Sequence, residues 1–374
     1  MIAAVVGAGI GGLAAAVGLQ RIGYDCVVFE EADALRLSGA GVTIWPNGAQ
    51  ALIRLGISID GLGRRMDRLE TRSAEGRLLY AIDGRRLADR FGVPVMMVPR
   101  RALLERLADA LAPGSVLFGR RCERVESGQF DAAVSFADHQ PESAGLVVGA
   151  DGHRSAVRRS LFGGGSAQPT GWIEWQGLTA LPTSVTNGAV SVVAVEKTGA
   201  CALIPAGENL TQWWFAMPDT PATRTPSSVV AMLRERFGGW LTPVSTLLDG
   251  LSDQDANLWI YVRHHVPSSL FVHRVVLVGD AAHAMPPTIG QGANQALEDA
   301  ATLSTALSLA SPDAGLVAYD RARRHKSAVV SRLARRAPAQ DPAAWSTRLT
   351  ARVPVGVSTW AFGSLLRAVS TVLT

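Results

Sequence analysis

The sequence is poor in the residues that build disulfide frameworks and metal sites. It has three cysteines, Cys26, Cys122 and Cys201, which lie far apart and form no Cys-x-x-Cys pair. This spacing indicates neither a disulfide framework nor a metal site. A reducing, cytoplasmic location is therefore the expectation.

Lysine is almost missing, and the net charge is small. Only Lys197 and Lys326 are lysines among 36 basic residues, and the net charge is +4. A basic excess this small and scattered argues against a nucleic-acid partner. The apolar first 20 residues are interrupted by five glycines and lack a basic start, so we expect neither a membrane span nor a signal peptide.

Several catalytic and metal-binding motifs are also absent. There is no Gly-x-Ser-x-Gly, no HExxH and no P-loop lysine motif. Asp253-x-Asp255-x-Asn257 begins like a calcium loop, but Leu258 and His264 stand where that loop needs glycine and glutamate. No metal site is expected.

What the chain does contain is a glycine-rich turn at its start. The apolar run Ile2–Val6 predicts a buried strand and is followed by Gly7-x-Gly9-x-x-Gly12 and an alanine-rich helical stretch. Gly7 allows a sharp turn, Gly9 lets a pyrophosphate approach the backbone, and Gly12 lets helix and strand pack closely. Such a turn also occurs without a ligand, so the motif needs support from other segments.

That support comes from a second strand. Residues 26–30 predict a strand that ends in Glu30, about 20 residues after the glycines, where a ribose hydroxyl needs an acceptor. The two segments together predict a nucleotide site. From these residues alone, an NAD dehydrogenase remains one open interpretation, although it leaves Asp151 and Asp280 without a role.

Three further segments fit a ligand but have ordinary alternatives. The glycine-rich passage 38–48 predicts a loop over a ligand or a plain surface loop. Arg100 opens a helix, where a cation suits a phosphate partner better than the helix dipole, or is simply solvated. Asp151 follows an apolar strand and is either a ligand or the N-cap of the next helix.

The middle of the chain changes in character. Segments 172–178, 189–195, 200–204, 212–217 and 258–262 are strand-like, with a helix at 227–237, which predicts an inserted antiparallel sheet.

After that sheet the chain returns to the nucleotide-domain pattern at 274–283, and a helix begins near Gly290. The basic residues of a helix over 313–336 predict a solvated face, and the apolar tail 353–374 is expected to pack on the body or on a partner subunit.

Three ordered motifs resemble one family. Gly7-x-Gly9-x-x-Gly12, the stretch Asp151–Arg158 and the stretch Gly279–Asn294 are together similar to the single-component (class A) FAD-dependent aromatic hydroxylases. That family includes para-hydroxybenzoate, salicylate, 6-hydroxynicotinate and urate hydroxylases and zeaxanthin epoxidase. The likeness covers about residues 1 to 335, since the 39–47 segment and Arg100 fit it as well.

The resemblance implies an α/β fold. It consists of a Rossmann-like FAD-binding domain of the glutathione-reductase type, an inserted antiparallel β-sheet substrate domain and C-terminal helices. We place the FAD-binding domain at 1–169 and 266–335, with a small β insertion near 67–98. The substrate domain then spans 170–265 and a helical tail spans 336–374.

The resemblance also implies which residues hold FAD. The glycines lie at its pyrophosphate with Arg100, Glu30 at the ribose, Cys122 at the adenine and Asp280 at the ribityl chain, while Asp151 and Arg158 serve both FAD and NAD(P)H. The full expected set is Gly7, Gly9, Gly12, Glu30, Arg100, Cys122, Asp151, Asp280, Pro287, Gly290, Gly292, Ala293 and Asn294.

The implied activity is that of a monooxygenase. NADH or NADPH would reduce FAD transiently, and a flavin C4a-hydroperoxide would insert one oxygen atom into a small aromatic or polyene substrate. The pocket must be dry, and Trp213 and Pro287 are possible further walls. The expected pocket residues are Trp45, Ala200, Gln212, Trp214 and Pro286.

Substrate choice is where the sequence departs from the family. Ala200 and Gln212 fall where urate hydroxylase carries Arg and Tyr, no catalytic base stands out, and His264 is expected to be structural. A urate-like substrate is therefore doubtful. A non-hydroxylating FAD oxidoreductase or a catalytically silent flavoprotein of the same fold is the alternative, as a monomer or homodimer.

Overall fold

The structure is a computed structural model of the 374-residue chain. It describes residues 1–36, 39–163, 165–180, 190–196, 198–207, 209–335 and 353–373. Four expectations fall partly outside these ranges: Ser38 of the glycine-rich passage, Ala189 at the start of an expected strand, Arg336 at the end of an expected helix, and residues 336–352 and 374 of the tail. Among the described residues, no helix is both long and apolar enough to span a membrane.

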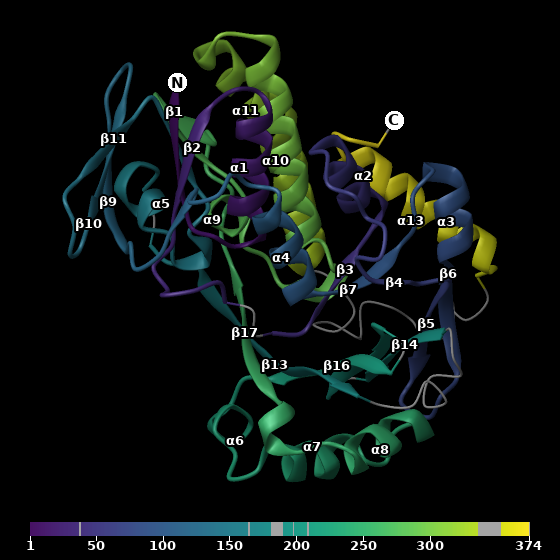
Figure 1. The fold of residues 1–374 in the computed structure, drawn as a ribbon. Coiled ribbons are helices and arrows are strands. Elements are labelled where there is room, and N and C mark those ends of the chain that lie inside the picture. The colour runs from purple at the N-terminus through teal and green to yellow at the C-terminus, as the bar shows by residue number, and fades with distance from the viewer. Residues whose placement is uncertain are drawn as a thin grey trace.

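A sheet that is parallel except for one antiparallel edge pair forms the centre of the upper half of the molecule (Figure 1). Its described strands lie in the order β18-β19-β12-β1-β2-β8, and β1 pairs in parallel with both β2 and β12. The strand bounds are β1 Ile2–Val6, β2 Asp25–Phe29, β8 Val116–Leu117, β12 Leu146–Gly149, β18 Phe271–Val272 and β19 Val275–Leu277. The expected α/β fold class is confirmed.

Helices cover one face of this sheet, and a small antiparallel sheet lies on the other side. The helices α1 and α10 pack against each other, and α11 packs on α10. The bounds are α1 Ile10–Arg21, α4 Arg100–Asp109, α5 Ala156–Leu161, α9 Asp280–His283, α10 Gly292–Leu309 and α11 Pro312–Arg335. The small sheet contains β9 Cys122–Ser127, β10 Ala132–Phe136 and β11 Glu142–Ala144.

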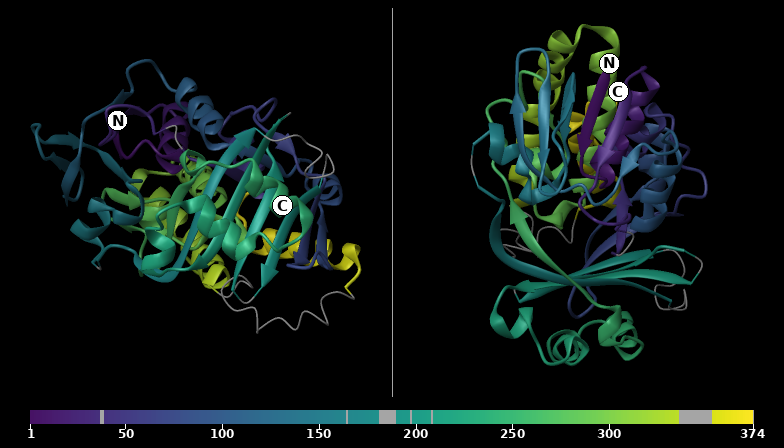
Figure 2. Two further views of the ribbon diagram at one scale, coloured as in Figure 1. Left: turned by 90° about the horizontal axis from the view of Figure 1, so that it is seen from below. Right: turned by 60° about the vertical axis from the view of Figure 1, so that its left-hand side comes forward.

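A second, larger sheet lies below the parallel one (Figures 1 and 2). Its described strands follow the order β17-β13-β16-β15-β14-β5-β6. The bounds are β5 Arg68–Ser73, β6 Leu78–Asp83, β13 Gln168–Ala180, β14 Val190–Glu196, β15 Gly199–Pro205, β16 Leu210–Pro218 and β17 Asn257–Arg263. Helices α6 Pro221–Arg224, α7 Val229–Phe237 and α8 Thr242–Asp249 cover its outer face.

This large sheet differs from the expected inserted sheet in two ways. Strands β5 and β6, which we placed in a small separate insertion near 67–98, pair into it at its edge. In addition, β5 runs parallel to β14, so the sheet is not purely antiparallel. The pairing of β5 with β14 was not predicted, because the sequence of a strand of 6 residues does not indicate a partner strand that is distant in the chain.

The remaining elements connect the two sheets. Strands β3 Gly41–Ile44, β4 Arg64–Arg65 and β7 Met96–Pro99 form a small sheet, accompanied by helices α2 Pro46–Arg54 and α3 Gly84–Phe91. Helix α13, Val355–Val369, lies beside β6 and α3. Because Val372 and Leu373 are buried in the core, the described tail packs on the body, as expected.

Candidate functional site

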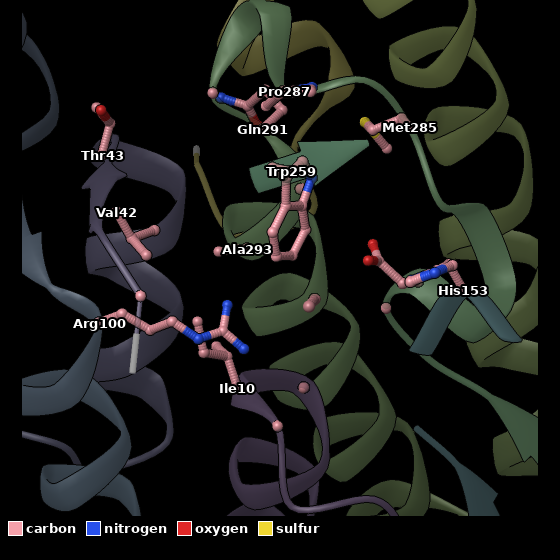
Figure 3. Close-up of a pocket in the computed structure, with 18 of the residues that line it drawn as sticks. Ile10, Val42, Thr43, Arg100, His153, Trp259, Met285, Pro287, Gln291 and Ala293 are labelled. Atoms are coloured by element: carbon pink, nitrogen blue, oxygen red, sulfur yellow. The ribbon is translucent and has the colours of Figure 1, made fainter. Parts of the chain in front are cut away.

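A cavity of about 1970 Å³ lies between the carboxyl ends of the parallel strands and the inner face of the large sheet (Figure 3). Ligands of open α/β sheets bind at this end of the strands. Most of the expected site residues line the cavity; the exceptions are Gly12, Arg158, Trp213, Pro286 and Asn294. The expected site residues therefore gather at one cavity of the described part of the chain.

The β1–α1 turn gives the cavity a backbone cradle. Gly7 has φ +103°, and a Cβ on Gly12 would stand 1.8 Å from the Gly7 carbonyl oxygen, so Gly12 serves close packing and not ligand contact. A Cβ on Gly9 would meet nothing within 4 Å, because Gly9 faces the open cavity. Helix α1 starts there without a side-chain cap, so its N-terminal N–H groups are free for an anion.

Glu30 is fixed at the end of β2 by backbone groups. Its Oε2 accepts from the Ala8 N–H at 2.8 Å, and its Oε1 accepts from the Ala32 N–H at 3.0 Å. Each carboxylate oxygen has a second lone pair, so the group can also accept hydroxyls of a ribose. The side chain is buried and lines the cavity.

Arg100, at the start of α4, and Asp280, at the start of α9, both line the cavity. The Arg100 guanidinium points into the cavity (Figure 3), and burial lowers its pKa while the nearby Asp280 carboxylate raises it. Within the described residues, the guanidinium makes no hydrogen bond. A half-buried cation without a hydrogen-bond partner fits a bound phosphate. Asp280 follows Gly279, whose φ of +57° turns the chain into α9.

Asp151 serves its own helix. Its Oδ1 accepts from Ser155 Oγ at 2.5 Å, and its Oδ2 accepts from the N–H groups of Ala156 at 2.6 Å and Val157 at 3.2 Å. Burial raises its pKa, which these hydrogen bonds partly offset. The N-cap of α5 is Ser155, so the expected N-cap position of Asp151 is wrong, although its carboxylate binds the first N–H groups of that helix and also lines the cavity.

Arg158 does not point into the cavity. It donates to the carbonyl oxygens of Ala281 and Ala282, both at 3.0 Å, and of His265 at 2.6 Å. The expected contact of Arg158 with FAD or NAD(P)H is wrong in this structure, since its guanidinium secures α9 and thereby the position of Asp280.

The start of α10 faces the cavity and is held in place by Asn294. Its side-chain Oδ1 accepts from the Trp45 N–H at 2.9 Å, and its Nδ2 donates to the carbonyls of Thr43 at 2.8 Å and Gly290 at 2.7 Å. The buried Asn294 thus ties β3 to α10. Gly292 and Ala293 line the cavity at the positive end of the helix dipole.

A buried network of charged side chains joins α10 to α11. Arg323 Nε donates to Asp299 Oδ1 at 2.6 Å, and its Nη1 donates to Glu298 Oε2 at 3.1 Å. Asp299 also accepts from the Gly279 N–H at 2.8 Å and contacts His283 Nε2 at 2.6 Å. Arg323 is fully buried, so the expectation that the basic residues of α11 form a solvated face is wrong for this one.

The inner face of the large sheet supplies the other wall. Gln212 and Trp214, expected to share a face, both line the cavity, as do Ala200 and Trp45. Gln212 Oε1 accepts from the Gly41 N–H, so this side chain joins the large sheet to the glycine-rich loop. Trp213 points to the opposite face, where it packs in the core beside α7, and is not a cavity wall.

Sequence reasoning missed a buried acid and phenol on this wall. The Tyr261 hydroxyl donates to Glu174 Oε2 at 2.7 Å, and both side chains line the cavity. Burial raises the pKa of Glu174 to about 7, and the Tyr261 bond lowers it. The available signal was a glutamate within the apolar run Trp172–Trp175, two residues before Gln176 on the same face.

Two other cavity side chains were not anticipated. His153 points into the cavity near Asp280, and burial lowers its pKa while that carboxylate raises it (Figure 3). Trp259, from the edge strand β17, projects into the cavity and is 41% exposed. His264 bonds the His153 carbonyl oxygen through Nε2 at 3.0 Å, in agreement with a structural role.

Comparison with known proteins places this geometry in context. A family model described as an FAD binding domain matches residues 1–337. An FAD-dependent urate hydroxylase of Klebsiella pneumoniae is 33% identical over 81% of this chain and 80% of its own length. The 3-amino-4-hydroxybenzoate 2-monooxygenase PtmB3 of Streptomyces platensis is 34% identical over 83% of this chain and 81% of its own.

Solved structures agree with the sequence relatives. The Klebsiella pneumoniae HpxO structure, complexed with FAD and uric acid, superposes with a TM-score of 0.83 at 28% identity, covering 98% of this chain and 93% of that one. A salicylate hydroxylase substrate complex has a TM-score of 0.81 at 23% identity, covering 100% and 97%, and shows the shared fold.

Proposed function

The chain belongs to the family of FAD-dependent aromatic hydroxylases, and on that premise we propose that it uses NADH or NADPH and O₂ to insert one oxygen atom into a small aromatic or polyene substrate. The observation that carries this proposal is one continuous cavity, which is lined both by the β1–α1 turn and by the inner face of the large sheet. A simple NAD dehydrogenase would not need Asp280 and the α10 N-terminus on the same hollow.

The residues present fit FAD. The open space at Gly9, the anchored Glu30 carboxylate and the unbonded Arg100 guanidinium suit a pyrophosphate and a ribose. Asp280 would accept from the ribityl hydroxyls, and the first N–H groups of α10 would stabilise negative charge on the reduced ring. Bound FAD supplies the reduction by NAD(P)H and the activation of O₂.

The protein's own contribution is to position the substrate and exclude water. Trp45, Trp214 and Pro287 present apolar surface to the cavity. A dry site favours oxygen transfer over unproductive release of hydrogen peroxide. Pro286 does not line the cavity and is not part of this wall.

The substrate is not expected to resemble urate. Ala200 and Gln212 line the cavity at the positions expected to differ from urate hydroxylase, and neither carries a charge or a phenol. On the inner face of the large sheet, Glu174 and Tyr261 line the cavity and are hydrogen bonded to each other. They are our candidates for contact with a polar group of the substrate.

The test uses the flavin-loaded protein with NADH, NADPH and a panel of phenols and polyenes under ¹⁸O₂. We expect bound FAD, substrate-stimulated NAD(P)H consumption and a product that has gained one labelled oxygen atom. Protein that neither retains nor takes up FAD would refute the proposal. FAD binding with background NAD(P)H consumption across the panel would instead favour the catalytically silent flavoprotein.

A matched pair of variants checks the assignment of Asp280. Asp280→Asn should weaken FAD binding at least tenfold because an amide is a poorer acceptor for ribityl hydroxyls. Asp249→Asn, at an exposed position distant from the cavity lining, should bind FAD as the parent does. Equal affinities in both variants would remove Asp280 from the cofactor site.

The proposal includes the remaining expectations on organisation. We propose that the FAD-binding domain consists of segments 1–169 and 266–335 and the substrate domain of segment 170–265. We also propose a cytoplasmic location and a monomeric or homodimeric state. Light scattering of the purified holoprotein measures the oligomeric state.

A further inference from the structure

Helix α13 forms one wall of the cavity. The side chains that line it lie three, four, seven, eight and eleven residues after Ser358, which is one face of a helix. They are Ser358, Ala361, Phe362, Leu365, Leu366 and Val369. The family model ends at residue 337, before α13 begins.

This helix is anchored at both ends. Ser358 Oγ donates to the Ala81 carbonyl at 2.6 Å, and Thr359 Oγ1 accepts from the Asp83 N–H at 2.9 Å. Beyond its C-terminal end, the Thr371 N–H donates to Glu298 Oε2 at 2.7 Å, which connects the tail to α10. The wall is therefore held in position before any substrate enters.

Apolar side chains of β6, β15 and the β3–α2 junction pack directly against α13 at this wall. The rings of Phe362 and Trp45 lie 4.6 Å apart between centroids. Leu366 is buried in one apolar cluster with Ile82 of β6 and Ile204 of β15. All of these residues line the cavity, so its end beneath α13 is enclosed by apolar groups.

Charge is distributed unevenly along the cavity. Apart from Glu174 of β13, its charged lining residues lie outside the large sheet, in segments 30–36, 120–123 and 151–159 and at Arg100 and Asp280. The described lining residues of β5, β6, β14, β15, β16, α11 and α13 are uncharged. A carboxylate placed there would lose its hydration with no cation to replace it.

We infer that the part of the cavity lined by Ile82, Ile204, Trp214, Phe362 and Leu366, the α13 subsite, binds an uncharged apolar substituent of the substrate. The substrate is then an aromatic or polyene compound that carries an alkyl, prenyl or second ring group and no carboxylate at that end. This inference rests on the proposed function, because it assumes that the reacting ring lies beside the flavin.

The test compares two phenols that differ in one terminal group. These are 4-hexylphenol and 6-(4-hydroxyphenyl)hexanoic acid, in which a carboxylate replaces the terminal methyl. Their dissociation constants with the FAD-loaded protein are measured from the change in flavin absorbance. We expect 4-hexylphenol to bind at least tenfold more tightly.

Two variants on α13 provide the control. Phe362→Arg places a cation in the subsite and should abolish or reverse the preference, since the acid gains a partner. Trp360→Arg makes the same kind of change on the outer face of the helix, where the side chain is 66% exposed, and should keep the tenfold preference. A preference that changes equally in both variants would place the effect outside the subsite.

Failure of the inference is distinguishable from failure of the proposed function. FAD binding with equal affinity for the two phenols, tighter binding of the acid, or no flavin change with either phenol up to its solubility limit would overturn the α13 subsite. Absence of FAD binding would overturn the proposed function, and the subsite with it.

Discussion

Gly9 and Gly12 of the first turn have different roles, and substitutions at the two positions should have different effects on FAD binding and on stability. Gly9→Leu should abolish FAD binding while leaving the apoprotein folded, because its Cβ enters open cavity. Gly12→Ala should destabilise the fold itself, by about 3 kcal/mol or more, because its Cβ would stand 1.8 Å from the Gly7 carbonyl oxygen.

Flavin fluorescence and urea unfolding of the apoproteins measure the two effects. Gly165→Ala is the control, since a Cβ there also meets nothing within 4 Å but the residue does not line the cavity. Retained flavin in Gly9→Leu, or an unchanged free energy of unfolding in Gly12→Ala, would contradict this account of the turn.

Glu174 should make stability depend on pH. Burial raises its pKa to about 7 from an ordinary value of 4.5, so between these values the folded protein keeps a proton that the unfolded chain has lost. The free energy of unfolding should therefore fall as pH rises from about 4.5 to about 7 and then level off, by about 3 kcal/mol from this group.

The measurement compares urea unfolding of parent and variant across this pH range. Glu174→Gln keeps the shape of the side chain without the titration, so the parent's extra decline should be missing from it. Glu235→Gln changes an exposed glutamate and should retain the decline. Parallel pH profiles for the parent and Glu174→Gln would refute the prediction.

Residues that act through a local motif were predictable from the sequence. The spacing of Gly7, Gly9 and Glu30 was sufficient to expect a nucleotide site, the family resemblance added Asp280, and all four line the cavity. The pairing of Glu174 with Tyr261 could not be foreseen, because 87 residues separate them and the antiparallel pairing of β13 with β17 brings them together.

At the scale of elements, α10 depends on a buried ion-pair network. Arg323→Met should lower the free energy of unfolding of the apoprotein by about 3–5 kcal/mol, because Asp299 and Glu298 would lose their buried guanidinium partner. The loss also affects Gly279, whose N–H donates to Asp299, so FAD affinity should fall as well.

The neighbouring residue provides the matched control. Arg324 pairs with Asp320 one helical turn away, and its side chain is 45% exposed. Arg324→Met should therefore change the free energy of unfolding by less than about 1 kcal/mol. Similar losses in both variants would mean that burial of the network does not set its strength.

Elements with a strong period were expected, and those defined by distant partners were not. The four strands expected between 172 and 217 lie within β13 to β16 where described, and α11 falls within about two residues of its expected bounds. The joining of β5 to β14 was missed because it depends on a pairing across more than a hundred residues. The short helix α8 was missed because its eight residues give little periodicity.

For the whole molecule, FAD should act as a stabilising ligand of both halves. At a free concentration of 100 times its Kd, a ligand bound only by the folded state adds about 2.7 kcal/mol to the free energy of unfolding. The cavity takes lining residues from the parallel sheet and from the large sheet, so the whole transition should shift. Calorimetry with and without FAD measures this.

The Gly9→Leu variant is the negative control for that experiment, since it should show no shift. A transition in which only part of the heat absorption moves with FAD would mean that the two sheets unfold independently. The overall α/β class and a pocket shared by the two sheets were predictable, whereas α13 was not foreseen as a wall of that pocket, because its place there depends on contacts with β6 and α3.

The order of strands in the parallel sheet also has a consequence for synthesis. Strand β12 is complete at Gly149, but its outer neighbour β19 begins only at Val275, after the large sheet has been encoded. On the ribosome, the buried residues of β12 therefore remain without their partner strand until the inserted segment has emerged. Slow translation across residues 150–274 would prolong the exposure of this unpaired, aggregation-prone strand edge. The expression yield should therefore depend on translation speed and on chaperones.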